Sequence, residues 1–103
     1  MIVVNVDYIP GKELELLGMV KGCTAHSKNI GRDIAAGFKT IVGGEIKGYT
    51  EMIEDARSVA EARMIAEASK MGADAVINVR YTSSSVMQSA SEILVFGTAV
   101  KFK

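Results

Sequence analysis

The sequence predicts one small α+β domain of two layers, in which a single long helix lies against a sheet. Three patterns indicate this class. Apolar residues recur every three or four positions between Tyr49 and Met71, residues 75–82 alternate between apolar and polar, and residues 93–102 are apolar on both alternating faces. A chain of 103 residues is close to the commonest domain size, so we expect one domain over residues 1–103.

The long helix has the clearest pattern in the chain. Acidic residues near its start and Lys70 near its end suit the helix dipole, and Gly72 is the expected C-terminal stop. Its apolar stripe, which should face the sheet, consists of Tyr49, Met52, Ile53, Ala56, Ala60, Met64, Ala68 and Met71.

Two strands and a short helix are expected before the long helix. Residues 2–9 are rich in β-branched side chains and predict a first short strand, which the turn residues Pro10 and Gly11 end. Residues 14–24 predict a longer strand. A short helix follows, capped by Ser27 or Asn29, and ends at Gly43 and Gly44.

The C-terminal third predicts two strands joined by a loop. Residues 75–82 form the first of these strands, the small polar residues from Thr82 to Ser91 form a hairpin loop, and residues 93–102 form the last strand.

The last strand is apolar on both of its faces, and this pattern predicts self-association. The long helix and the short one can cover a single face of a three- or four-stranded sheet, and a second copy of the chain could cover the other. Alternatively, the short helix and the N-terminal strand fold across that face. The residues left without a partner in the first case are Leu94, Phe96, Val100 and Phe102, or their alternates.

Charge and cysteine content exclude several classes of function. Lys and Arg number 12, equal to Asp and Glu, so no net field attracts nucleic acid or an anionic membrane surface. No stretch is long and apolar enough to span a bilayer, and the first residues lack the basic region of a signal peptide. With one cysteine the chain forms no internal disulfide, and we expect a cytoplasmic protein.

Several short blocks are spread from about Leu16 to Lys101. They are Asn29-x-x-Arg32-Asp33, Ile41-Val42-Gly43-Gly44 followed by Tyr49, Ala56-Arg57, Gly72-Ala73-Asp74-Ala75-Val76 and Gly97-Thr98-Ala99-Val100. Together they closely resemble the YbjQ-like family of uncharacterised proteins, which often carries a heavy-metal-binding label. The resemblance implies a dodecin-like β-α-β-β subunit, with an antiparallel sheet backed by the long helix, that assembles as a ring-shaped homopentamer.

The family's metal label directs attention to Cys23 and His26. Heavy-metal-associated domains hold a soft metal in a Cys-x-x-Cys loop, and the corresponding stretch here is Cys23-Thr24-Ala25-His26, with one thiol. Both side chains could bind one soft or transition metal ion if the chain turns by Ala25, whereas in an extended strand they would point to opposite faces. The alternative is that Cys23 is an inert small hydrophobic residue.

A second candidate site is a polar pocket between subunits. It would place Arg32, Glu45, Tyr49 and Arg57 around the Gly43–Gly44 loop, with arginine binding an anion. The alternative is structural, with Arg32 pairing with a carboxylate and the glycines ending a helix.

The sequence therefore predicts a homo-oligomeric protein that binds a small ligand or a metal. A structural ring that presents a surface to a protein partner is the competing class. An enzyme that depends on Cys23 and His26 is also open, although no third residue that would orient this pair can be named.

Overall fold

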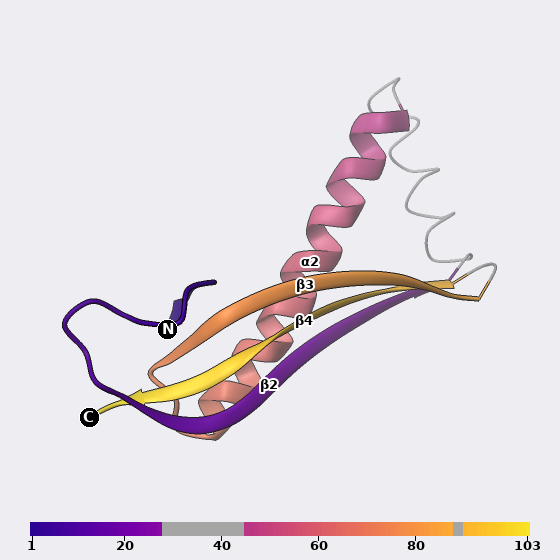
Figure 1. Ribbon diagram of the computed structural model, residues 1–103. Coiled ribbons are helices and arrows are strands. Elements are labelled where there is room, and N and C mark those ends of the chain that lie inside the picture. Colours follow the sequence, from indigo (N-terminus) through magenta and orange to yellow (C-terminus); the bar gives the residue numbers. More distant parts are fainter. Residues whose placement is uncertain (28–44, 88–89) are drawn as a thin grey trace.

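A computed structural model of the chain describes residues 1–27, 45–87 and 90–103. In this part the chain forms strands β1 (Ile2–Val3), β2 (Leu14–Ser27), β3 (Ala75–Met87) and β4 (Ala90–Phe102), and helix α2 (Glu45–Lys70) (Figure 1). The short helix expected between Asn29 and Gly43 lies outside the described residues.

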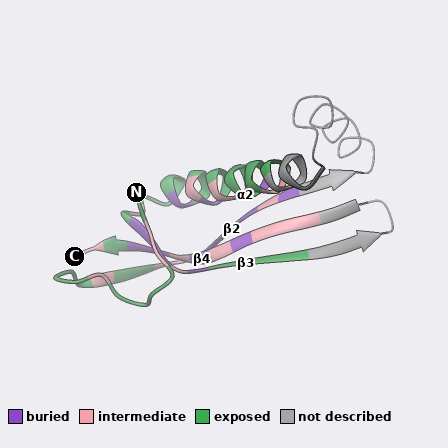
Figure 2. Cartoon of the chain, turned by 90° about the horizontal axis from the view of Figure 1, so that it is seen from above, coloured by how far each residue is buried: buried purple, intermediate pink, exposed green. Residues whose placement is uncertain are grey.

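The strands form a four-stranded sheet in the order β1-β3-β4-β2. The three long strands are antiparallel, because β4 pairs with β2 on one side and β3 on the other. Two-residue β1 runs parallel to β3, which makes the sheet mixed. Helix α2 lies along one face of this sheet (Figure 2). The predicted α+β class, with one long helix on a sheet, is confirmed.

Helix α2 packs the predicted small-residue stripe on the sheet. Ala56, Ala60, Met64 and Ala68 are buried, and the last three form one core cluster with Val20, Val76, Val95 and Ala99 of the strands. Met71 was expected on this stripe but is 38% exposed, because it follows the end of the helix. Within the described residues, no helix has the length and apolar character needed to cross a membrane.

Gly72 ends the helix, as predicted. Its φ of 77° lies in the left-handed region that favours glycine. The amide of Gly72 donates to the Ser69 carbonyl at 3.0 Å, and the amide of Ala73 donates to the Ala68 carbonyl at 3.1 Å. These bonds satisfy carbonyls that would otherwise have no partner at the helix end.

The polar segment after Thr82 is strand and not the expected hairpin loop. β3 continues to Met87 and β4 begins at Ala90, with Thr82 paired with Leu94 and Ser85 with Ser91. Serine and threonine backbones make ladder hydrogen bonds as well as apolar residues do. A polar side chain therefore does not by itself show that the chain leaves the sheet.

The N-terminal segment covers part of the sheet face opposite α2. Val4 and Ile9 pack with Leu14 and Phe102 around the buried residues Ala75, Ile77 and Val100. The first strand is shorter than the expected residues 2–9. The expectation that Val100 and Phe102 lack a partner in the same chain is therefore wrong. At this end of the face the N-terminal segment covers them, as the alternative interpretation predicted.

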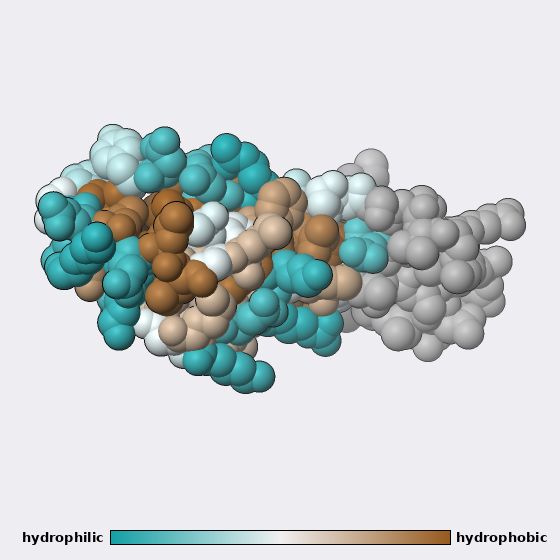
Figure 3. Space-filling view, turned by 60° about the horizontal axis from the view of Figure 1, so that its bottom comes forward, coloured by the Kyte–Doolittle hydropathy of each residue, from teal (hydrophilic) through white to brown (hydrophobic). Residues whose placement is uncertain are grey.

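Elsewhere on β2 and β4 the same face stays open. Leu94 and Phe96 are only half-buried, while Leu16 and Met19 of β2 are 74% and 73% exposed. The space-filling view shows hydrophobic surface gathered in the middle of the described part, with hydrophilic surface around it (Figure 3). The predicted uncovered apolar surface is thus present over part of the sheet.

A β-bulge interrupts β3 between Ile77 and Arg80. Asn78 takes a left-handed φ of 53°, so the predicted simple alternation of residues 75–82 fails here. As a result, Val76 and Val79 both join the core beneath α2. A side chain at Gly97 would meet these valines, with its Cβ 2.7 Å from Val76 Cγ1 and 3.1 Å from Val79 Cγ2. Gly97 therefore provides the room for the bulge.

Candidate metal site on the open sheet face

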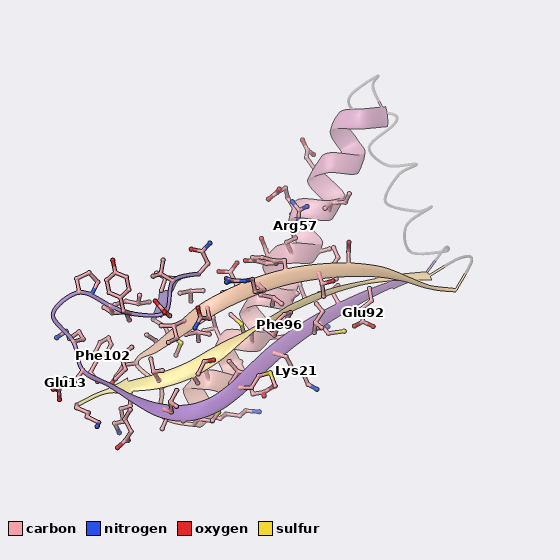
Figure 4. The ribbon with its side chains drawn as sticks, in the orientation of Figure 1. Glu13, Lys21, Arg57, Glu92, Phe96 and Phe102 are labelled. Carbon is pink, nitrogen blue, oxygen red and sulfur yellow. The ribbon has the colours of Figure 1, made fainter. Side chains whose placement is uncertain are left out.

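Cys23 lies on the open face of the sheet beside a carboxylate. It pairs with Leu94 across the β2–β4 ladder, and Glu92 is two residues from Leu94 on the same face of β4. Lys21, two residues before Cys23, shares this face and pairs with Phe96. Figure 4 labels Lys21, Glu92 and Phe96 on this part of the sheet. Cys23 is half-buried, so an ion could reach its sulfur.

The surroundings of Cys23 favour its protonated form. Burial raises the pKa of the thiol, and the negative charge of Glu92 and its hydrogen bond with the thiol raise that pKa further. Arg63 and Lys21 act in the opposite direction and do not outweigh these effects. Near neutral pH the sulfur therefore carries a proton, which an incoming metal ion must displace.

The backbone around Cys23 is held against α2. Arg63 Nη1 donates to the Cys23 carbonyl at 2.6 Å, and Thr24 Oγ1 donates to the Ala56 carbonyl at 3.1 Å. Gly22 lies directly under the backbone of Ala60 and Met64. The strand at Cys23 is thus fixed on its helix side, while its other side faces away from α2.

The structure does not bring Cys23 and His26 together through a turn. β2 continues to Ser27, with Ala25 paired with Glu92 and His26 paired with Ser91. The turn by Ala25 that a shared ion requires is therefore absent from the strand. The side chain of His26 lies outside the described part of the structure.

The second predicted constellation can be followed only at Arg57. This side chain forms an exposed ion pair with Glu54, with Nη1 and Oε1 2.9 Å apart. Glu45 and Tyr49 belong to the first turns of α2, but their side chains are not described, and Arg32 lies outside the described residues. An exposed pair of this kind contributes little to stability, so Arg57 is free to exchange partners.

Glu92 is the candidate ligand that the sequence analysis missed. It adjoins the segment interpreted as a loop, and a residue beside a loop has no predictable partner across the sheet. The register of the β2–β4 pair reveals its position, because it places residues 92, 94 and 96 opposite residues 25, 23 and 21. Within the described residues, no group of three or more His, Cys, Asp and Glu side chains could hold an ion. One chain therefore offers a thiol and a carboxylate, which is an incomplete site.

The thiol should become reactive only as the pH rises. Thiolate is the nucleophile, so alkylation of Cys23 by iodoacetamide is expected to be slow at neutral pH and to accelerate as the pH passes through the raised pKa. Glu92→Gln removes a charge that raises this pKa, so it should increase the rate at neutral pH. Mass spectrometry of the alkylated fraction over time measures both effects.

Glu15→Gln is the matched control for this measurement. Glu15 is exposed on β2 and pairs with Lys101, so its removal changes the net charge equally without touching Cys23. Cys23 of the Glu15→Gln protein should be alkylated at the wild-type rate. Equal rates for Glu92→Gln and wild type at every pH would contradict the proximity of Glu92 to the thiol.

The fold and this site define a class of small α+β proteins with one helix on a long antiparallel sheet and a single half-buried thiol on the free sheet face. A family model described as "Putative heavy-metal-binding" matches residues 1–103. The chain belongs to this family, the YbjQ or UPF0145 family. The predicted family membership is confirmed.

Relatives from several bacteria match along nearly their whole length. A UPF0145 protein of Alkaliphilus metalliredigens is 60% identical over 102 residues, covering 99% of both chains. One from Clostridium novyi is 56% identical over 101 residues, covering 98% of both chains. One from Fervidobacterium nodosum is 60% identical over 104 residues, covering 100% of this chain and 96% of that protein.

A solved structure supports the fold. The crystal structure of a protein of unknown function of the DUF74 family, from Pediococcus pentosaceus, superposes with a TM-score of 0.71 at 11% identity. The match covers 100% of this chain and 98% of that one. At this level of identity the likeness shows the fold alone.

Proposed function

We propose that this chain is the subunit of a cytoplasmic homo-oligomer that binds a soft divalent metal ion, with Cys23 as the thiolate ligand and Glu92 as the second ligand. The observation that carries the proposal is the placement of the thiol and the carboxylate side by side on the open sheet face. The description of the family is consistent with it.

The donor set selects the class of metal. Thiolate favours soft or borderline ions such as Zn²⁺ and Cd²⁺, and a carboxylate oxygen completes part of a tetrahedral shell. An ion bound between the two groups would also relieve their repulsion once the thiol has lost its proton. Two positions then remain for water or for groups from a second copy.

Open edges and apolar surface support the oligomer. Among the described strands, β2 has a partner only on its β4 side. The outer edge of β3 is hydrogen-bonded to the N-terminal segment as far as Val79, and no described strand pairs with it beyond that residue. Long unpaired edges bind further strands readily, and Leu16 and Met19 add exposed apolar surface nearby. A second copy of the chain can satisfy both features. The family resemblance adds the expectation of a pentameric ring.

Native mass spectrometry of protein purified without chelator or affinity metal, with and without added Cd²⁺, tests the proposal. The wild-type protein should appear as a homo-oligomer that takes up Cd²⁺ in proportion to its subunits. Cys23→Ser should keep the oligomer and lose the ion. Glu92→Gln should weaken binding by at least about tenfold, since it removes a ligand charge, and Glu15→Gln should have no effect.

The same experiment separates the alternatives. Loss of Cd²⁺ on His26→Ala with normal binding by Glu92→Gln would identify His26 as the second ligand instead. Equal binding by Cys23→Ser and wild type would refute the metal site. An oligomer without any adduct would favour the scaffold, whereas a stable monomer would contradict self-association.

A further inference from the structure

A second site lies at the β3 edge, where the N-terminal segment, the bulge of β3 and helix α2 meet. A cavity of about 780 Å³ that is widely open to solvent lies there, lined by Val3, Val4, Asn5, Glu61, Val79, Arg80 and Tyr81. Cavities that hold small ligands have roughly this size and combine apolar walls with a few polar groups. Neither Cys23 nor Glu92 belongs to it.

The guanidinium of Arg80 is fixed at this cavity from one side only. Its Nη1 atom donates to the carbonyls of Asn5 at 3.1 Å and Val79 at 3.2 Å. The edge formed by Nε and Nη2 makes no hydrogen bond or ion pair with any described residue. These two N–H groups form a parallel fork that matches the two oxygens of a carboxylate.

The bulge of β3 sets the position of Arg80. Asn78 has a left-handed φ of 53°, and its amide donates to the Val6 carbonyl at 3.0 Å. The next amide, of Val79, donates to the Val4 carbonyl at 3.1 Å. Bulges of this kind redirect side chains near binding sites. Here the bulge binds the N-terminal segment alongside β3 and thereby brings the carbonyl of Asn5 to Arg80.

The cavity lining also includes the carboxylate of Glu61, which is hydrogen-bonded to Tyr81. Tyr81 donates its hydroxyl to Glu61 Oε2 at 2.8 Å, so one oxygen of this carboxylate is occupied. Val3 and Val4, which are partly exposed, supply most of the apolar lining, and Val79, which is 6% exposed, adds a small part. The site thus combines one free arginine fork, a short aliphatic surface and the carboxylate of Glu61, which makes no ion pair with Arg80 in the described structure.

We propose that this cavity binds a small monocarboxylate with a short, branched aliphatic body, whose carboxylate is held by the Nε–Nη2 edge of Arg80. The valine side chains would contact the aliphatic part. A phosphate ester fits less well, because a dianion would be repelled by Glu61 and would leave the valines uncovered. The proposal is independent of the metal site.

Titration with isocaproate, followed by NMR of the methyl groups of the lining valines, tests the site. Wild-type protein should show saturable shifts of Val3, Val4 and Val79 at concentrations up to about 10 mM, which suffices for a millimolar Kd. The neutral analogue isocaproamide should bind at least about tenfold more weakly, because it lacks the charge-assisted hydrogen bonds.

Two variants of Arg80 and one control decide the role of the fork. Arg80→Gln should weaken isocaproate binding at least about tenfold. Arg80→Lys keeps the charge but not the fork, and it too should bind several-fold more weakly. Lys70→Gln removes an equal charge from the exposed end of α2 and should bind like the wild type. Unshifted core methyl groups of Val76 and Val95 in Arg80→Lys will show that the fold is intact.

Several results would overturn the proposal. These are the absence of shifts in the wild type, equal affinity for isocaproate and its amide, and equal affinity of the Arg80→Lys and wild-type proteins. Cd²⁺ binding should be unchanged in Arg80→Lys, so failure of this site is distinguishable from failure of the metal site.

Discussion

Replacing Gly22 with valine is expected to destabilise the protein by about 3 kcal/mol or more. A Cβ atom at this position would overlap the carbonyl oxygen of Ala60 and lie 2.5 Å from the amide nitrogen of Met64. Both atoms belong to the helix backbone and cannot rotate away, so α2 would have to move off the sheet. Urea denaturation should show a lower midpoint.

Lys21→Val is the control for Gly22→Val. Lys21 is the preceding residue of β2, is exposed and faces away from α2, so valine there changes strand propensity without a clash. Lys21→Val should change the free energy of unfolding by no more than about 0.5 kcal/mol. If Gly22→Val unfolded at the same urea concentration as Lys21→Val, this result would contradict the close packing of α2 on β2 at Gly22.

Met64→Ala is expected to lower the free energy of unfolding by about 2–5 kcal/mol. Met64 is fully buried at the centre of the cluster that joins α2 to the sheet, where it packs among Val20, Val76 and Val95. Truncation removes buried apolar surface and leaves a cavity that the rigid sheet cannot fill. Thermal and urea unfolding measure the loss.

Met71→Ala provides the matched comparison for Met64→Ala. Both residues were expected on the same helical stripe, but Met71 is 38% exposed beyond the end of α2. Met71→Ala should lower the free energy of unfolding by less than about 1 kcal/mol. If both variants lowered the free energy of unfolding equally, the assignment of Met64 to the core and of Met71 to the surface would be wrong.

The close contact at Gly22 also bears on the metal proposal. Gly22, Cys23 and Thr24 are successive residues of β2, and the two outer ones are fixed to α2, through backbone packing and through the bond from Thr24 to Ala56. The strand alternation then directs Cys23 to the opposite face, toward Glu92. The rigidity of the helix side therefore positions the thiol, and Gly22→Val should disturb both stability and metal binding.

The two proposed sites occupy different parts of one sheet. The thiol–carboxylate pair bridges β2 and β4, whereas the arginine fork belongs to the outer edge of β3. They share no residue, so single substitutions separate them. Self-association could cover either part, and the subunit count in native mass spectrometry should be determined before ligand affinities are compared.

The sequence by itself determined the elements with strong periodicity. The stripe of small and apolar residues defined α2 and its buried positions, Gly72 marked its end, and β-branched or apolar runs marked the strands. These features depend on local spacing, since helices and strands repeat their side-chain directions every few residues. The family resemblance was carried by short blocks of residues in the same way.

The tertiary structure alone decided how the strands meet. The pairing of β2 with β4 placed Glu92 beside Cys23, extended the polar segment after Thr82 as strand, and kept β2 straight at Ala25. The bulge at Asn78 and the N-terminal segment created the cavity at Arg80. Such features depend on contacts between residues distant in the sequence. No local pattern encodes them, because register and bulges are set by packing across the whole sheet.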